Sequence, residues 1–313
     1  MTSSKDRVSQ LIKDKARALG FKACGIAGAV PLDQESGILR QWLKDGHHGT
    51  MAYMNRNVDK RLNPLLLNDW ARSVIMVLYN YYPDDPSLSE NNYKISKYAY
   101  GKDYHDVIKT KLQQIVDAIE DEMGEITARV FVDSAPVMEK VWAVKCGLGW
   151  TGKNSCLINK SSGSFFFLGT IITNIELNYN EEKSPDHCGQ CTKCMDACPN
   201  AAIISPGIID ARKCISYLSI EHQGAFSSED EGKLHGWIFG CDICQDVCPW
   251  NRFSSPHREA EFLPSPALKL MTDQDWKDLD EKTFHELFDG TALERTGFAA
   301  LRRNIEQGIK NKE

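Results

Sequence analysis

Two cysteine-rich runs constrain the fold of this chain more than any other feature. The first, CGQCTKCMDACP (188–199), spaces its cysteines as C-x2-C-x2-C-x3-C-P. The second, CDICQDVCP (241–249), has the same x3-C-P ending but one cysteine fewer. In two-cluster bacterial ferredoxins, the first three thiolates of such a run bind one 4Fe-4S cube and the fourth binds the other. The spacing therefore predicts a ferredoxin-like unit with two 4Fe-4S cubes.

The crossed pattern of these ferredoxins assigns eight thiolates to the two cubes. The first cube is expected to bind Cys188, Cys191, Cys194 and Cys248, and the second Cys198, Cys214, Cys241 and Cys244. Cys214 is included because it is the remaining cysteine between the two runs. A zinc site made of two C-x2-C pairs is the alternative, but zinc takes four ligands and leaves the x3-C-P endings unexplained.

Cysteine content and charge indicate the setting in which the chain works. The sequence has 11 cysteines, no signal-peptide core and no long apolar run, which favours metal or redox chemistry in the cytoplasm and no membrane segment. Cys24, Cys146 and Cys156 lie outside the eight and are expected to be buried core residues. The net charge of -6 gives no overall attraction to nucleic acid, so a polyanionic partner must meet a local basic surface.

Hydrophobic periodicity predicts an α+β domain ahead of the cysteine runs. Residues 5–19 and 103–124 repeat apolar side chains every three to four positions, which is typical of amphipathic helices. Residues 73–82 and 128–133 are short β-branched or aromatic runs that are expected to form strands. Residues 156–174 hold two strand-like runs around a Ser-Ser-Gly turn, and the expected hairpin would make the sheet mixed.

These patterns divide the chain into three predicted segments. Residues 1–178 are expected to form an α/β domain with a mixed sheet, and residues 179–260 the ferredoxin-like two-cluster domain. Residues 261–313 are expected to form a short helical C-terminal segment. The polar, turn-rich stretch 178–187 is the predicted linker between the first two segments.

Several motifs occur in an order that resembles the epoxyqueuosine reductase family. They are HHGTMAYMNRN (47–57), SKYAYGKDYH (96–105), VDSAPVMEK (132–140), GLGWTGKNSCLIN (147–159), SYLSIEHQG (216–224) and GCDICQDVCPWN (240–251), together with the first cysteine run. The resemblance implies an oxidoreductase that reduces epoxyqueuosine to queuosine in a tRNA anticodon loop, with cobalamin in the N-terminal domain and two 4Fe-4S clusters. A cobalamin-dependent reductive dehalogenase and a non-enzymatic two-cluster electron carrier are the alternatives.

The resemblance assigns Asp133 as the residue that donates a proton to the opening epoxide. Asp133 lies at the end of a predicted strand and shortly before Pro136, which is suited to the first turn of a helix. By spacing alone, Asp133 or Ser134 would cap that helix. A free aspartic acid has a pKa of about 3.9, so the acid role requires burial that raises this pKa.

The resemblance also implies the cobalamin contacts. The expected contacts are Arg56, Asp133, Lys153, Asn154, Ser155, Ile158, Gly169, Gly240, Asp242 and Ile243. The GCDIC segment (240–244) is expected near cobalt, because electrons must pass from a cube to the corrin. The sequence has no D-x-H-x-x-G signature, so we predict base-off cobalamin without a histidine ligand from the protein.

The substrate and the electron donor complete these expectations. The expected tRNA contacts are Lys94, Lys97, Lys102, His222, Gln223 and LRRN (301–304), with SYLSIEHQG facing the substrate. Because the chain is acidic, phosphate contacts should be few, and recognition should rest on shape and on a flipped-out modified base. An external one-electron reductant of the flavodoxin or ferredoxin type is expected, and the protein is expected to be a monomer.

Overall fold

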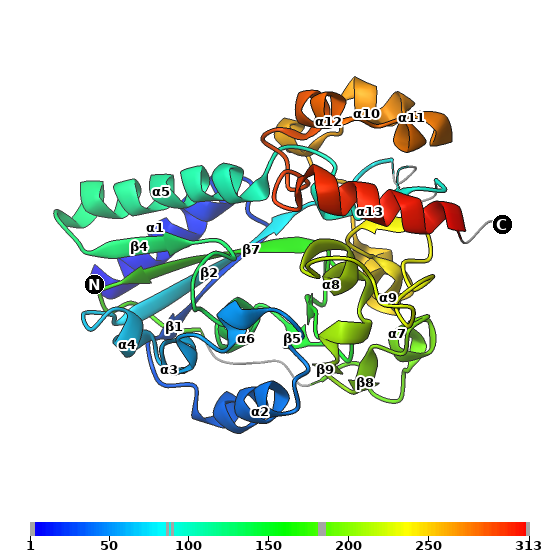
Figure 1. The fold of residues 1–313 in the computed structure, drawn as a ribbon. Helices are drawn as coiled ribbons and strands as arrows, with labels where there is room; N and C mark the ends of the chain where they lie inside the picture. The colour runs from blue at the N-terminus through cyan, green and yellow to red at the C-terminus, as the bar shows by residue number, and fades with distance from the viewer. Residues whose placement is uncertain (1–3, 86–87, 89–90, 181–185, 311–313) are drawn as a thin grey trace.

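The computed structural model describes residues 4–85, 88, 91–180 and 186–310, and it has the predicted α+β class. A four-stranded sheet lies between two layers of helices, and the cysteine-rich segment and the C-terminal helices pack beside it (Figure 1). Residues 181–185 of the predicted linker lie outside the described residues. Within the described ranges, no helix is long and apolar enough to cross a membrane.

The central sheet has the strand order β1-β2-β7-β4. Its strands are β1 (Ala23–Gly28), β2 (Ser73–Asn80), β7 (Phe166–Thr173) and β4 (Ala128–Phe131). All neighbouring strands are antiparallel, so the predicted mixed sheet is wrong in this detail. β2 and β4 run parallel to each other, but β7 is inserted between them. The mostly buried side chains of β7 suit this central position, where both faces of the sheet are covered.

The predicted hairpin over residues 156–174 is also wrong. β6 (Leu157–Ile158) pairs with β5 (Trp150–Thr151) in a separate two-stranded sheet. The Ser-Ser-Gly turn is closed locally by a bridge between Asn159 and Gly163, and the chain then enters β7 in the central sheet. The predicted turn is present, but the apolar run that follows it forms β7 at the centre of the four-stranded sheet and does not pair with β6.

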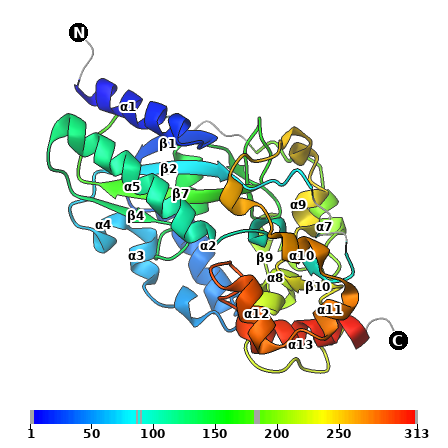
Figure 2. The same cartoon turned by 90° about the horizontal axis from the view of Figure 1, so that it is seen from above.

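The two helices predicted from periodicity are confirmed and lie on one face of the sheet (Figure 2). They are α1 (Ser4–Ala18) and α5 (Tyr104–Met123). Asp103 caps α5 by accepting a 2.9 Å hydrogen bond from the His105 N–H, and the helix ends at Gly124 with a φ of 83°. The opposite face is covered by α2 (Asp33–Lys44), α3 (Val58–Leu62), α4 (Pro64–Leu67) and α6 (Glu139–Lys145).

The cysteine-rich segment is built from short elements. They are α7 (Lys193–Asp196), β8 (Ile203–Ser205), β9 (Ile208–Ile209), α8 (Ile215–Ile220), β10 (Trp237–Phe239) and α9 (Ile243–Asp246). β10 pairs in parallel with β3 (Lys94–Ile95), which joins this segment to the N-terminal one. Short 3-10 helices cover Ala52–Met54, Lys97–Ala99, Ala211–Lys213, Pro249–Phe253 and Ala260–Phe262.

The predicted helical C-terminal segment is confirmed. It contains α10 (Pro266–Leu270), α11 (Asp273–Lys277), α12 (Glu281–Phe288) and α13 (Gly297–Lys310). Leu301 and Ile305 of α13 share one core with Ile238 and Phe239 of β10 and with Tyr100. One apolar core therefore contains residues of all three predicted segments, and the boundaries after residues 178 and 260 stay predictions.

Gly25 in β1 is a position where the fold leaves no room for a side chain. A Cβ atom there would lie 2.2 Å from the Cys146 carbonyl oxygen. We therefore expect Gly25→Ala to lower the free energy of unfolding by about 1–3 kcal/mol. Gly37 in α2 is the matched control: no atom lies within 4 Å of its Cβ position, so Gly37→Ala should raise stability by about 0.5–1 kcal/mol. Urea unfolding measures both, and an unchanged Gly25→Ala protein would contradict the packing described here.

Candidate active site and cluster centres

A cavity of about 890 Å³ lies beside the central sheet, next to helix α6 and the turn between β8 and β9. Much of its wall is apolar, with Leu39, Trp42, Val141, Val144, Leu168 and Ile208 among the lining residues. Ionisable side chains also line it, including Arg61, Tyr104, Asp133, Glu139, Lys140 and Lys153. An apolar cavity of this size with a few convergent polar groups is typical of a site for a large organic ligand.

Asp133 lies on this cavity immediately after β4, in a left-handed backbone conformation with a φ of 50°. Its Oδ2 accepts a 2.9 Å hydrogen bond from the Tyr104 hydroxyl. Its backbone N–H donates a 3.0 Å hydrogen bond to Glu139 Oε1. The left-handed conformation is unfavourable for a residue with a side chain, so these contacts hold the carboxyl group in a position that the chain would not otherwise favour.

The alternative role of Asp133 or Ser134 as a helix cap is wrong. α6 begins only at Glu139, and its N-cap residue Met138 makes no side-chain capping bond. The sequence predicts Pro136 in the first turn of the helix. In the structure Pro136 lies in the loop before α6. The side chain of Asp133 is exposed at the cavity and is not used to satisfy a helix terminus.

Tyr104 and Glu139 are site residues that the sequence reasoning missed. Tyr104 stacks on Phe167 with ring centroids 4.2 Å apart, and burial, followed by the charge of Asp133, raises the pKa of its phenol. Burial, followed by the charge of Asp133, also raises the pKa of the Glu139 carboxyl to about 8. Both residues lie within the quoted motifs 96–105 and 132–140, and that position is the signal that could have identified them.

Further polar groups surround Asp133 and come from distant parts of the chain. Arg295 donates a 2.5 Å hydrogen bond to Glu221, and Arg61 donates a 3.1 Å hydrogen bond to the Tyr53 carbonyl oxygen. Burial alone would lower the pKa of Arg295, but the charges of Glu221, Tyr53 and Asp133 raise it. Arg295 was not predicted, because it lies in the C-terminal segment, far from Asp133 in sequence, whereas Glu221 belongs to SYLSIEHQG (216–224), which is expected to face the substrate.

The expected cobalamin contacts Lys153 and Ser155 line the same cavity as Asp133. Lys153 Nζ donates a 2.7 Å hydrogen bond to the Gly189 carbonyl oxygen in the first cysteine run. Ser155 Oγ donates a 2.5 Å hydrogen bond to the Gly207 carbonyl oxygen in the turn between β8 and β9. The loop that contains both residues therefore connects the cavity wall to the cysteine-rich segment.

Apart from Asp133, the other expected cobalamin contacts are not among the described residues that line this cavity. Asn154 and Ile158 lie instead at the cavity formed by the first group of cysteines, and Arg56 is an exposed side chain just after the 3-10 helix Ala52–Met54. Gly169 is buried in β7, and a Cβ atom there would lie 2.9 Å from Val77, within the core beneath α5. Gly240, Asp242 and Ile243 are absent from the described lining residues as well.

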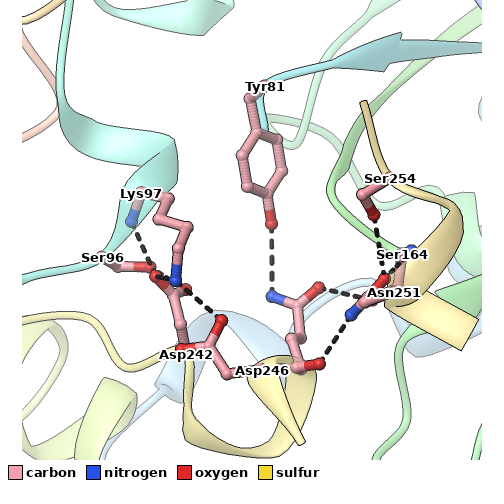
Figure 3. A network of polar contacts seen from close by, with 9 residues as sticks. Tyr81, Ser96, Lys97, Ser164, Asp242, Asp246, Asn251 and Ser254 are labelled. Atoms are coloured by element: carbon pink, nitrogen blue, oxygen red, sulfur yellow. Dashed lines mark hydrogen bonds and ion pairs between the residues drawn. The ribbon is translucent and has the colours of Figure 1, made fainter. Parts of the chain in front are cut away.

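Asp242 and Lys97 are joined in a buried ionic network, so their predicted roles need correction (Figure 3). The Asp242 side chain accepts hydrogen bonds from Ser96 Oγ at 2.5 Å and from the Lys97 N–H at 2.8 Å. Lys97 Nζ lies 2.7 Å from Asp246 and 3.6 Å from Asp242. Lys97 is only 5% exposed, so its ammonium is unavailable to a tRNA phosphate, and fully buried Asp242 is unavailable to a corrin.

The remaining expected tRNA contacts divide into exposed and structural residues. Gln223 is exposed, and Lys102 is half exposed in an ion pair with Glu261. His222 stacks on Phe226 in the loop after α8. The LRRN motif (301–304) is structural, which corrects its predicted role: Arg303 donates to the carbonyl groups of residues 218, 222 and 224, and Asn304 donates to those of residues 219 and 238.

The first predicted group of thiols surrounds one small cavity. Cys188, Cys191, Cys194 and Cys248 line a space of about 190 Å³ together with Lys153, Pro249 and Trp250. Burial raises the pKa of Cys194 and Cys248, so both thiols would be neutral at pH 7 without a cationic partner. Iron would supply that partner and make them thiolates.

The second predicted group is also brought together. Burial raises the pKa of Cys214 and of Cys241. Cys198 is an electrostatic neighbour of both thiols, and Cys214 is also a neighbour of Cys241. Cys244 has Cys241 and Cys214 as neighbours. Among the described residues, no three His, Cys, Asp or Glu side chains are arranged to hold a single metal ion.

The three cysteines expected in the core differ in their surroundings. Cys146 is fully buried, and Cys24 is partly buried against the core under α1 and α5. Cys156 instead lies in hydrogen-bonding contact with Cys244, at the second group of thiols. The expectation of a core position is therefore met by Cys146 but not by Cys156.

Comparison with known proteins gives matches over nearly the whole chain. Residues 187–251 match a family described as a 4Fe-4S double cluster binding domain, and residues 61–134 match epoxyqueuosine reductase QueG, DUF1730. The chain is 50% identical over 304 residues to an epoxyqueuosine reductase from Cyclobacterium marinum, covering 97% of each chain.

Solved structures give the same relationship. A crystal structure of epoxyqueuosine reductase with an epoxyqueuosine-modified tRNA-Tyr stem loop matches with a TM-score of 0.89 and 27% identity, over 97% of this chain and 81% of that chain. An epoxyqueuosine reductase from Bacillus subtilis, with its catalytic aspartate loop swung out of the active site, matches with a TM-score of 0.88 and 26% identity, over 97% and 82%.

Cys214 is the most informative thiol to replace. Because its loss would leave the second cube one ligand short, Cys214→Ala should lower iron and acid-labile sulfide to about half and leave the first cube assembled. Cys24→Ala is the matched control, since it removes a thiol outside both groups. Iron and sulfide analysis with electron paramagnetic resonance of the reduced protein measures this. Full iron content in Cys214→Ala would remove Cys214 from the ligand set.

Proposed function

The chain belongs to the epoxyqueuosine reductase family, and we propose that it is an oxidoreductase that reduces epoxyqueuosine in a tRNA anticodon loop to queuosine. The observation that carries the proposal is the position of Asp133, held by Tyr104 and Glu139 at a large apolar cavity beside the double-cluster segment. A simple electron carrier would need no such cavity.

The cavity suits a cobalamin. Its apolar walls fit the faces of a corrin ring, and donors such as Lys153, Lys140 and Arg61 fit the amide oxygens and the phosphate at its periphery. Bound there, cobalamin would supply a strongly reducing, nucleophilic cobalt centre. Asp133, Lys153 and Ser155 remain the proposed contacts from the expected set, and the proposed form is base-off without a histidine ligand from the protein.

Asp133 acts as the acid in this proposal. Its carboxyl group donates a proton to the epoxide oxygen as the carbon–oxygen bond breaks, so that a hydroxyl forms in place of an alkoxide. Tyr104 orients the carboxyl group through its hydroxyl group. The swung-out aspartate loop of the Bacillus subtilis relative supports a role for this loop.

Electrons are proposed to reach the cavity through the two 4Fe-4S clusters, with the eight assigned cysteines as ligands. Each cube passes one electron at a time, so an external one-electron donor of the flavodoxin or ferredoxin type must deliver two electrons for each turnover. A tRNA substrate places the enzyme in the cytoplasm. We propose a monomer, since one chain contains the cavity, the acid and both groups of thiols.

The tRNA is proposed to approach over the rim formed by Tyr53, Glu221 and Arg295. Arg295 is half exposed, supplies the cation of this rim and has Asp133 among its electrostatic neighbours. His222, Gln223 and Lys102 remain proposed contacts, and Lys97 is withdrawn because it is buried. The related structure with a modified stem loop supports a binding face of this kind.

Replacement of Asp133 tests the acid. Asp133→Asn keeps the size and the Tyr104 contact but has no transferable proton, so conversion of epoxyqueuosine tRNA should fall about 100-fold or more. Cobalamin binding and iron content should be unchanged, and Asp14→Asn on α1 is the matched control. Nucleoside mass spectrometry measures the product, with and without added cobalamin. Full activity in Asp133→Asn would exclude this acid.

Replacement of Arg295 tests the rim. Arg295→Gln should raise KM for the tRNA about 10-fold, because the guanidinium is a charge-assisted donor to phosphate or base, while cofactor binding stays the same. Arg17→Gln on α1 is the control for a lost surface charge. Steady-state kinetics at fixed salt separates KM from kcat, and an unchanged KM would contradict the proposed approach.

A further inference from the structure

The proposed reaction consumes two protons, but Asp133 holds only one. Reduction breaks both carbon–oxygen bonds of the epoxide, forms a carbon–carbon double bond and releases the oxygen as water, using two electrons and two protons. We propose that Glu139 supplies the second proton by reprotonating Asp133 within the same turnover. This inference rests on the proposed function and assigns a residue to a step that the proposed acid cannot complete alone.

The two carboxyl groups are neighbours at one wall of the cavity. Glu139 opens α6, and its Oε1 lies 3.0 Å from the backbone nitrogen of Asp133. Both residues line the cavity, and Tyr104 contacts Asp133 from the opposite element, α5. The hydrogen bond to the Asp133 backbone brings the Glu139 carboxyl group next to Asp133 at the same cavity wall, so a relay of one water molecule would be enough to pass a proton to the Asp133 carboxyl group.

The surroundings of Glu139 suit a group that stores a proton. The groups that act on it are Asp133 from the loop, Lys140 from α6 and Thr170 from β7, and Tyr104 and Arg61 line the same cavity from α5 and α3. Burial is the main cause that raises its pKa to about 8, and the charge of ionised Asp133 adds to it; the hydrogen bond from the Asp133 N–H, Lys140 and Thr170 act in the opposite direction. At neutral pH the carboxyl group is therefore mostly protonated, whereas a free glutamic acid, with a pKa of about 4.3, is ionised.

The sequence of proton transfers balances. Asp133 protonates the oxygen when the first carbon–oxygen bond breaks, and the carboxylate that remains takes the proton of Glu139. Reprotonated Asp133 then protonates the hydroxide that leaves when the second bond breaks, giving water. The two electrons come from the external reductant through the clusters, and solvent returns two protons to the pair between turnovers.

A purely structural role for Glu139 makes a different prediction. As a structural residue, Glu139 would only accept the hydrogen bond from the Asp133 N–H and hold the loop in its left-handed conformation. Glutamine keeps that oxygen acceptor but carries no transferable proton. Aspartate keeps the proton but shortens the side chain. The two variants therefore separate proton supply from loop positioning.

Kinetics over pH 6 to 9.5 tests the proposal on the loaded holoenzyme. The rate of the wild-type enzyme should fall as the pH rises through about 8, because Glu139 loses its proton there. Glu139→Gln should lower kcat about 10- to 100-fold and remove this limb, whereas Glu139→Asp should restore part of the rate. Glu176→Gln, at an exposed ion pair with Lys5, is the matched control.

A second measurement reads the same carboxyl group without turnover. In protein labelled with ¹³C at the glutamate carboxyl carbons, one signal should titrate near pH 8, vanish in Glu139→Gln and shift to lower pH in Asp133→Asn. An active wild-type enzyme whose Glu139→Gln variant keeps its rate and pH profile would overturn the role of Glu139 alone. A wild-type enzyme with no activity on epoxyqueuosine tRNA would overturn the proposed function and this inference together.

Discussion

The buried carboxylate of Asp242 is the interaction on which the arrangement of this protein depends. It accepts hydrogen bonds from Ser96 and from the backbone of Lys97, and the Lys97 ammonium lies between Asp242 and Asp246. These contacts fix the cysteine loop that begins α9 against the N-terminal segment. A buried charge that loses one partner costs several kcal/mol, about 3–5 kcal/mol in measured cases, so the network strongly resists separation of the two segments. It therefore keeps the thiol groups at a constant distance from the cavity.

The loop at Asp133 depends on a different balance. A left-handed conformation at a residue with a side chain costs about 1–3 kcal/mol, and here it is offset by hydrogen bonds to Tyr104 and Glu139. Both partners belong to helices packed on opposite faces of the sheet, α5 and α6. The position of the Asp133 carboxyl group therefore depends on the spacing of α5 and α6 across the sheet, and a fold with the same motif but another helix spacing would place this group elsewhere.

The sequence predictions were correct for features that depend on residues close in sequence and wrong for features that depend on distant partners. The thiol groups and the helices at 4–18 and 104–123 depend on local spacing, and the structure brings these thiols together and forms these helices. The hairpin at 156–174, the exposed role of Lys97 and the corrin role of Asp242 depended on distant partners, and all three differ from the structure. Arg295 was missed for the same reason, whereas Tyr104 and Glu139 lie within the motifs 96–105 and 132–140 and could have been identified there.

The C-terminal segment links the substrate rim to the core. Arg303 and Asn304 of α13 donate hydrogen bonds to carbonyl groups of residues 218–224, and Asn304 is fully buried. Arg295, just before α13, pairs with Glu221 on the same loop. A loop without such donors would have unsatisfied carbonyl groups and several conformations, because loops have few contacts of their own. Helix α13 therefore orders residues 218–224, and it does so with residues that the sequence suggested as nucleic-acid contacts.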